Sequence, residues 1–140
     1  MDIDHVVLWV KSAKDSLHFY VNTLGFEAER EKAFYAGEVL FPSVRINDKT
    51  ILDIMEYGSL LTLVQKSTGT TANAGGMPIN HLCLSLTQQE YDCIIERLNR
   101  SGVQLTSAGE HVFGAQGKAP CATYFNDIDG NIIEIRFYDN

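Results

Sequence analysis

Hydrophobic and polar residues alternate in two similar segments, one at the start of the chain and one just past its middle. Residues 3–10 read Ile-Asp-His-Val-Val-Leu-Trp-Val, and residues 79–86 read Ile-Asn-His-Leu-Cys-Leu-Ser-Leu. Alternation with a period of two is typical of a β-strand that buries one face. A histidine stands third in both segments, which indicates two copies of one structural unit.

An amphipathic helix is predicted after each of these strands. Apolar residues recur at i, i+3, i+4 and i+7, so each helix carries one apolar stripe. Ser12 with Asp15, and Thr87 with Glu90, have the spacing of a capping box at a helix start. A glycine follows each predicted helix end, where a left-handed residue is favoured. The stripes are Leu17, Tyr20, Val21 and Leu24, and Tyr91, Ile94, Ile95 and Leu98; the glycines are Gly25 and Gly102.

Both halves also close with the same pattern. Residues 46–54 and 125–135 each contain a strand ending at Asn-Asp, a turn, and a strand with an acid in third place, Asp53 or Glu134. The second turn includes Asp129-Gly130, a hairpin signal. We therefore predict an α+β fold of two βαβββ modules. The expected strands lie near 2–10, 26–34, 38–47 and 50–56, and near 79–86, 103–112, 120–126 and 131–138.

The predicted organisation is one domain over residues 1–140. Module one covers 1–57, residues 58–78 form a linker, and module two covers 79–140. Within the linker, residues 66–76 have the composition of a flexible connection. The segment 59–65 has no counterpart in the second half, and its pattern fits a helix or a strand.

Composition narrows the classes of function. The chain has 140 residues, 45% of them hydrophobic and 21% charged, as in ordinary globular domains. A net charge of −7 argues against a nucleic-acid partner. No long apolar run or signal peptide is recognisable, so we expect a cytoplasmic protein that does not bind membranes. Three cysteines without a CxxC pair indicate reduced thiols.

Two histidines and two acids occupy comparable places in the predicted strands. In each strand the purely aliphatic or aromatic phase is the one that lacks the histidine or acid. That phase needs burial under the helices, so the opposite face is free to line a cavity. An N/O ligand set of this kind suits Mn²⁺, Fe²⁺, Co²⁺, Ni²⁺ or Zn²⁺. The alternatives without a metal are that the histidines are hydrogen-bonded structural residues and that the carboxylates are solvated or paired with an arginine. The candidate metal ligands are His5, Asp53, His81 and Glu134.

Several motifs resemble those of the vicinal oxygen chelate superfamily of glyoxalases, extradiol dioxygenases and fosfomycin- and bleomycin-resistance proteins. They are Ile-Asp-His at 3–5, Leu-Gly-Phe at 24–26, Asn-His at 80–81, and Tyr-Phe-Asn-Asp-Ile-Asp-Gly-Asn at 124–131 ahead of Glu134. The resemblance spans essentially the whole chain. It implies a curved, half-open eight-stranded barrel with outer helices, the four candidate ligands around one divalent metal, and a homodimer.

Individual members of the superfamily match less well. Glyoxalase I has a Glu where Asp53 stands and an Arg where Trp9 stands. Fosfomycin transferases have a Thr where this chain has Val7, and residues 116–119 do not reproduce their potassium loop. Extradiol dioxygenases have a Tyr ten residues before the Glu, as Tyr124 is here, but their further catalytic His has no obvious match. The chain is most similar to small members whose substrates are undefined.

Two functions follow from this resemblance. The first is a metal-dependent enzyme that chelates a small substrate through adjacent oxygens, with lyase, isomerase or dioxygenase chemistry. Asp53 is then a ligand or a base, Tyr124 is catalytic, and Trp9, Tyr124 and Arg136 bind substrate. The purely structural alternatives are that Tyr124 only fills the barrel and that Arg136 only neutralises an acid. The second function is a bleomycin-resistance-like protein that binds a drug or metabolite without chemistry. The substrate, the native metal, and whether one chain or two build the site stay open.

Overall fold

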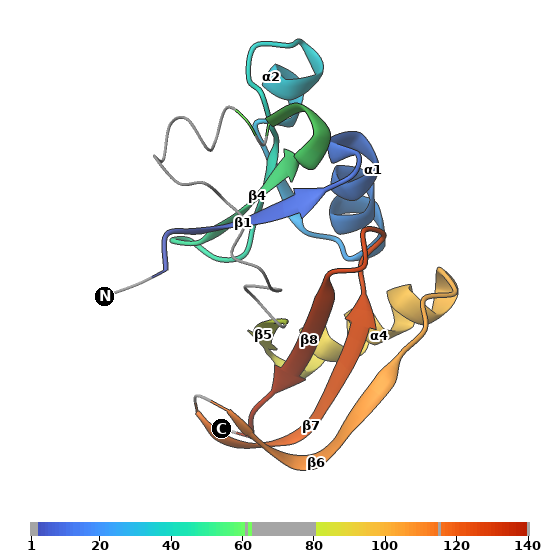
Figure 1. Ribbon diagram of the computed structural model, residues 1–140. Coiled ribbons are helices and arrows are strands. Elements are labelled where there is room, and N and C mark those ends of the chain that lie inside the picture. Colours follow the sequence, from blue (N-terminus) through green and yellow to red (C-terminus); the bar gives the residue numbers. More distant parts are fainter. Residues whose placement is uncertain (1–2, 61, 63–80, 115, 140) are drawn as a thin grey trace. The chain divides into compact units, whose positions relative to one another are not determined.

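The computed structural model describes residues 3–60, 62, 81–114 and 116–139 (Figure 1). The chain divides into two compact units, Met1–Pro78 and Ile79–Asn140. Each unit contains one four-stranded mixed sheet together with helices. The predicted α+β class and the pair of βαβββ modules are therefore confirmed.

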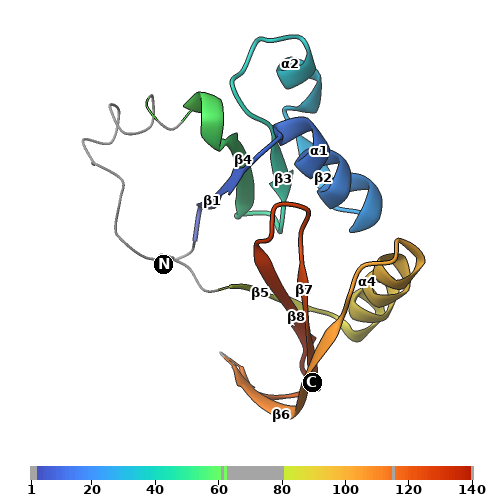
Figure 2. The ribbon, with the colours of Figure 1, turned by 45° about the vertical axis from the view of Figure 1, so that its right-hand side comes forward.

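In the first unit the strand order is β1-β4-β3-β2. β1 runs parallel to β4, whereas β3 is antiparallel to both of its neighbours. Helix α1 continues into the π-helical segment η1, and both views place this helix on one side of the sheet (Figure 1, Figure 2). The elements are β1 (His5–Val10), α1 (Ala13–His18), η1 (Phe19–Thr23), β2 (Glu27–Glu29), α2 (Glu31–Tyr35), β3 (Ser43–Arg45) and β4 (Ile51–Glu56).

Two of the predicted strands in this unit are much shorter than expected. The strands expected at 26–34 and 38–47 are β2 and β3, three residues each, and helix α2 lies between them. Residues 31–33, Glu-Lys-Ala, are strong helix formers, and no residue of α2 is buried, so no sheet contact opposes the helix. The ambiguous segment 59–65 begins within a helical stretch that includes residues 57–60 and 62. Its remainder, and the predicted linker at 66–76, lie outside the described residues.

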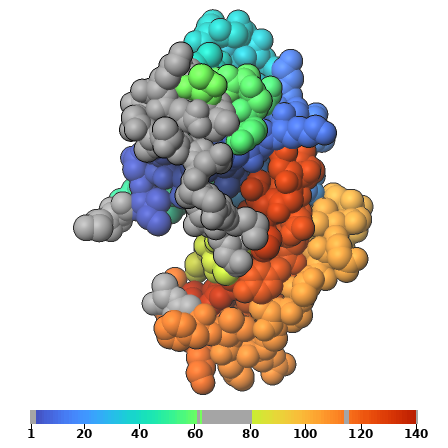
Figure 3. Space-filling view, in the orientation of Figure 1, coloured from blue at the N-terminus to red at the C-terminus, as the bar shows by residue number. Residues whose placement is uncertain are grey.

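In the second unit the strand order is β5-β8-β7-β6, with β5 parallel to β8. Helix α4 packs against β5 and β8, and α4 and β6 form much of the surface of this unit in the view of Figure 3. At one end of the β6–β7 pair, Phe113 is opposite Lys118 and Gly114 is opposite Gly117. The elements are β5 (Leu82–Leu86), α4 (Gln88–Arg100), β6 (Thr106–Gly114), β7 (Gly117–Asn126) and β8 (Ile132–Phe137).

Local signals in the sequence produce the expected helix ends. Thr87 and Glu90 form the complete capping box, and Ser12 accepts a hydrogen bond from the Asp15 amide. Gly25 and Gly102 have φ values of 82° and 71°, in the left-handed region that glycine tolerates.

The turns that close the two sheets are built alike. Asn47 Oδ1 accepts hydrogen bonds from the amides of Lys49 and Thr50. Asp127 Oδ1 accepts hydrogen bonds in the same way from the amides of Asp129 and Asn131. Asp127 is therefore a turn-forming residue, and this turn fixes where β8 begins.

The aliphatic phase of the strands is buried as the sequence predicts, while His5, Asp53 and Glu134 lie on the opposite phase. In β8 the opposite phase is buried as well, because Glu134 and Arg136 are only 1% and 5% exposed. Among the described residues no helix is long and apolar enough to cross a membrane. Buried members of the aliphatic phase are Leu8, Val10, Leu52, Ile54, Leu84, Ile133, Ile135 and Phe137.

Candidate functional site

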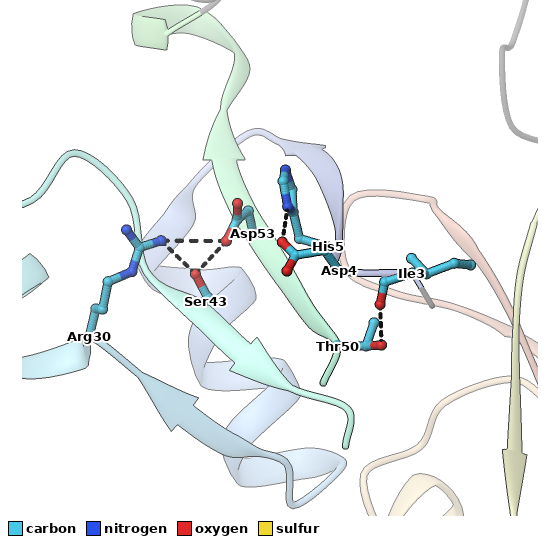
Figure 4. A network of polar contacts seen from close by, with 7 residues as sticks. All are labelled: Ile3, Asp4, His5, Arg30, Ser43, Thr50 and Asp53. Carbon is cyan, nitrogen blue, oxygen red and sulfur yellow. Dashed lines mark hydrogen bonds and ion pairs between the residues drawn. The ribbon is translucent and has the colours of Figure 1, made fainter. Parts of the chain in front are cut away.

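His5 and Asp53 lie close together on the sheet of the first unit. The parallel register pairs His5 with Ile51 and Val7 with Asp53, so the histidine and the acid are diagonal neighbours on one face. Figure 4 shows the His5 ring and one Asp53 oxygen pointing to the same side. The hydrogen bond to Asp4 raises the pKa of His5 most, and the negative charge of Asp53 raises it further.

The neighbouring Asp4 sets the tautomer of His5. Asp4 Oδ1 lies 2.7 Å from His5 Nδ1. An ionised carboxylate can only accept a hydrogen bond, so Nδ1 carries the proton. In the neutral ring this leaves the lone pair on Nε2, and metal-binding histidines commonly have such a carboxylate partner. Asp4 therefore leaves His5 Nε2 able to bind a metal ion.

Asp53 is anchored through one of its two oxygens. Ser43 is directly opposite Asp53 in the β3–β4 register, and its hydroxyl donates to Asp53 Oδ1 at 2.6 Å. Arg30 Nη2 donates to Ser43 Oγ at 2.6 Å and lies 3.4 Å from the same Asp53 oxygen. No hydrogen bond to Asp53 Oδ2 occurs within the described part of the chain. This oxygen is available for a ligand although the side chain is only 10% exposed.

The second unit places its own histidine beside its own acid. His81 lies just before β5, and its Nε2 is 3.0 Å from Glu134 Oε2. Glu134 is almost fully buried, with 1% of its side chain exposed. Cys83 is directly opposite Glu134 in the register. Burial raises the pKa of the Cys83 thiol, and the Glu134 charge raises it further, which keeps the thiol protonated at neutral pH.

Arg136 holds the other oxygen of Glu134. Its Nε donates to Glu134 Oε1 at 3.1 Å, and Nη2 donates to the same oxygen. Nη1 donates to the carbonyl oxygens of Phe113, at 2.9 Å, and Val112, at 3.4 Å. Because this buried guanidinium is held at both ends, the contacts favour positioning of Glu134 over direct contact with a substrate. They match the alternative in which Arg136 neutralises an acid.

Tyr124 lies next to both members of the second pair. It is directly opposite Glu134 in the β7–β8 register, and its ring meets the His81 ring edge-on with centroids 5.4 Å apart. Burial raises the pKa of Tyr124, and interaction with Glu134 raises it further, so the phenol is a neutral hydrogen-bond donor at pH 7. Tyr124 also lines a small depression of about 190 Å³, together with Val103, Gln104, Thr106, Phe125 and Asn126.

Trp9 occupies the same strand phase as His5 in the first unit. Its ring contacts the Tyr57 ring edge-on, with centroids 5.8 Å apart. Trp9 is partly buried and Tyr57 is exposed. These two aromatics provide an apolar surface on which a ligand can pack.

Each predicted histidine thus has the predicted acid of its own unit as a neighbour. Within the described segments, no group of three or more His, Cys, Asp and Glu side chains forms a cluster suited to a metal ion. The sequence patterns do not identify Arg30 or Ser43 as site residues. Ser43 becomes relevant only through the β3–β4 register, and Arg30 only through the turn between β2 and α2.

Solved structures of similar fold come from several bacteria. A protein from the mobile metagenome of V. pseudocholerae has a TM-score of 0.70 and 22% identity, covering 100% of this chain and 96% of its own. A glyoxalase/dioxygenase from Nostoc punctiforme has a TM-score of 0.66 and 20% identity, with coverages of 99% and 92%. TnmS3, an antibiotic binding protein from Streptomyces sp. CB03234, has a TM-score of 0.62 and 19% identity, with coverages of 99% and 97%. At these identities the likeness concerns the fold.

The sequence itself identifies the family. No curated protein matches the chain in sequence. The profile of one superfamily, however, matches residues 2–135, nearly the whole chain, in agreement with the fold of both units. The chain therefore belongs to the Glyoxalase/Bleomycin resistance protein/Dioxygenase superfamily.

Proposed function

We propose that this protein is a divalent-metal-dependent enzyme that chelates a small substrate through adjacent oxygens. The proposed ligands are His5, Asp53, His81 and Glu134. The observation that carries the proposal is the repeated register. In both units the acid is directly opposite the residue two positions after the histidine, Val7 in one and Cys83 in the other. Membership of a superfamily whose members commonly bind a divalent metal supports it further.

The chemistry of the donor groups fits a metal. In both units a protein group holds one carboxylate oxygen. The second oxygen is Asp53 Oδ2 in the first unit; in the second unit it is Glu134 Oε2, which lies 3.0 Å from Nε2 of the other proposed ligand, His81. Ser43 and Arg30 hold Asp53 Oδ1, and Arg136 holds Glu134 Oε1. Such contacts from surrounding residues orient metal ligands and tune their affinity. Two imidazoles and two carboxylates suit Mn²⁺, Fe²⁺, Co²⁺, Ni²⁺ or Zn²⁺.

Residues of the chain have separate parts in the proposed reaction. When bound, the metal supplies a Lewis acid that stabilises negative charge developing on the substrate oxygens. Tyr124 donates a hydrogen bond to a substrate oxygen, since its raised pKa keeps the phenol protonated. Asp53 Oδ2 accepts a proton where the metal does not occupy it. Trp9 packs against an apolar part of the substrate. The family accommodates lyase, isomerase and dioxygenase chemistry within this scheme.

A second function is a binding protein without chemistry. One observation favours it: Glu134 and Arg136 form a buried ion pair that balances its own charge without a metal. In this case Trp9 and Tyr57 hold a flat apolar drug or metabolite against an acidic protein. The superfamily includes bleomycin resistance proteins, and one structural neighbour is named as an antibiotic binding protein.

Metal titration of untagged protein separates the two functions. We expect one Mn²⁺, Co²⁺ or Zn²⁺ to bind per chain, with affinity reduced at least about tenfold in His5→Ala and in His81→Ala. The matched control is His18→Ala, which removes an exposed histidine at the end of α1. Unchanged metal binding in both ligand variants, or no binding to the wild type, would support the binding-protein function instead.

We also propose that the protein is a homodimer that binds a small molecule. Light scattering after gel filtration then gives about twice the chain mass of 15.6 kDa. A mass equal to that of one chain would contradict the dimer and leave the metal proposal intact.

A further inference from the structure

Arg30 has an unusual position in the first unit. It lies between β2 and α2 with φ 61° and ψ 15°, in the left-handed region that residues other than glycine rarely occupy. Such a conformation costs on the order of 1 kcal/mol or more, and it is kept where surrounding contacts determine it. The contacts of Arg30 with Phe41, Ser43 and Asp53 hold it in this conformation.

Those contacts fix the plane of the guanidinium group. The Arg30 Cζ atom lies 4.4 Å from the centroid of the Phe41 ring, in cation–π geometry. On the inner side, Nη2 donates to Ser43 Oγ, which is buried and in turn donates to Asp53 Oδ1. A stacked face and one anchored nitrogen leave little freedom for rotation of the group. Figure 4 shows the anchored nitrogen of Arg30 beside Ser43 and Asp53.

The rest of the guanidinium group is open to a ligand. Within the described part of the chain, Nε and Nη1 of Arg30 make no hydrogen bond, and 38% of the side chain is exposed. The contact with Asp53 is long, at 3.4 Å, so this carboxylate balances the positive charge only in part. The nearby Glu29 does not supply the remaining charge, because Arg45 binds it at 2.6 Å.

We propose that Arg30 is an anion-binding residue that receives a carboxylate group of the ligand. A planar, charged fork with unused donors matches a carboxylate, and stacking on Phe41 orders it in advance. The anion on Arg30 lies beside Asp53, on the face that also carries His5. The inference rests on the proposed function, in which a metal ion binds two adjacent oxygens of the substrate. It narrows the substrate class to small carboxylic acids with a hydroxyl or carbonyl group next to the carboxylate.

The negative charge of Asp53 couples this site to the metal. An anion on Arg30 is repelled by Asp53 unless a cation balances that carboxylate. We therefore expect the anion and the divalent ion to raise each other's affinity by the same factor. Arg30 itself is held by Phe41 and Ser43, so its position does not depend on the cation.

Lactate and lactamide test the inference, since both carry adjacent oxygens and only lactate is an anion. Calorimetry on Mn²⁺-saturated, untagged protein should give lactate at least about a tenfold advantage over lactamide. Arg30→Met keeps an apolar stem over Phe41 and should abolish this preference. Because Arg30 also contacts Asp53, the variant is measured with enough Mn²⁺ to keep it saturated. Arg30→Lys should retain part of the preference. The control Arg100→Met removes an exposed cation in the last turn of α4, in the other unit, and should leave the preference unchanged.

The outcomes distinguish this inference from the proposed function. Equal affinities for lactate and lactamide, no lactate binding at millimolar concentration, or an unchanged preference in Arg30→Met would overturn the anion site, whatever the metal content. If no Mn²⁺ binds but lactate is still preferred in an Arg30-dependent way, the anion site stands and the metal-dependent function fails. Circular dichroism of each variant verifies that it is folded.

Discussion

Replacing Arg136 by Met is expected to destabilise the second unit strongly. Arg136 and Glu134 are 6% and 1% exposed, and the substitution leaves the buried carboxylate without its main partner. Removing one member of a buried ion pair costs about 3–5 kcal/mol. His81 Nε2 lies 3.0 Å from the other Glu134 oxygen and remains a polar partner of the carboxylate. We therefore expect the free energy of unfolding to fall by about 3 kcal/mol, near the lower end of this range.

Urea denaturation measures this loss, and thermal melting gives an independent value. With an unfolding entropy of about 2.1 cal/mol/K per residue, 140 residues give about 0.29 kcal/mol/K, so 3 kcal/mol lowers Tm by about 10 °C. Both measurements are made with a chelator present, so that metal binding does not add to the difference.

The double variant Glu134→Gln/Arg136→Met isolates the charge effect. If the unpaired carboxylate causes the loss, the double variant should be more stable than the two single losses added together predict, by about 1–3 kcal/mol. A loss below about 1 kcal/mol in Arg136→Met alone, the size found for exposed pairs, would refute this reasoning.

Further predictions concern the helix cap, the metal ligands and the core. Thr87→Ala should cost about 1 kcal/mol in urea unfolding. Hydrogen bonds from the Thr87 amide and hydroxyl lower the pKa of Glu90 in the folded protein. The stabilisation that they give is present above the unfolded pKa of Glu90 and is lost as the pH falls through the folded pKa. If the free energies of unfolding of wild type and Glu90→Gln differ by the same amount at every pH, this prediction is wrong. Ser43→Ala should lower metal affinity about 10–100-fold by titration, because it releases Asp53. Leu98→Ala, at a fully buried position, should lower the free energy of unfolding by about 2–5 kcal/mol. A loss as small as that of a substitution at an exposed position would contradict the place of Leu98 in the core.

Local patterns in the sequence were sufficient to predict most of the fold. The Thr87–Glu90 capping box depends on four consecutive residues, and the strand phases around His5 and Glu134 depend on simple alternation. The duplication also reinforced each prediction with a second copy. Helix α2 was missed because residues 31–35 lie between two short strands, β2 and β3, and residues 31–34 were read as the end of a longer strand at 26–34. Nothing local indicated that the chain would reverse at Arg30 through a left-handed residue.

Contacts between distant residues account for what the sequence could not predict about the site. His5 and Asp53 were recognised as a pair because each has a counterpart in the other half. Ser43 and Arg30 have no such counterpart, and their contacts with Asp53 depend on the β3–β4 register. Arg136 was recognised as a possible partner of Glu134. Its second set of contacts, with the carbonyl groups of Val112 and Phe113, requires the extended β6–β7 hairpin.

Anomalous diffraction from crystals of the untagged protein grown with Mn²⁺ or Co²⁺ is the sharpest test of the four-residue metal site. We expect one strong anomalous peak per chain, with both histidine Nε2 atoms and the Glu134 carboxylate at about 2.0–2.2 Å, whether one chain or two supply them. Asp53 should lie at the same distance or one water further. The absence of a peak from metal-containing crystals, or a peak bound by the histidine and acid of a single unit alone, would contradict it.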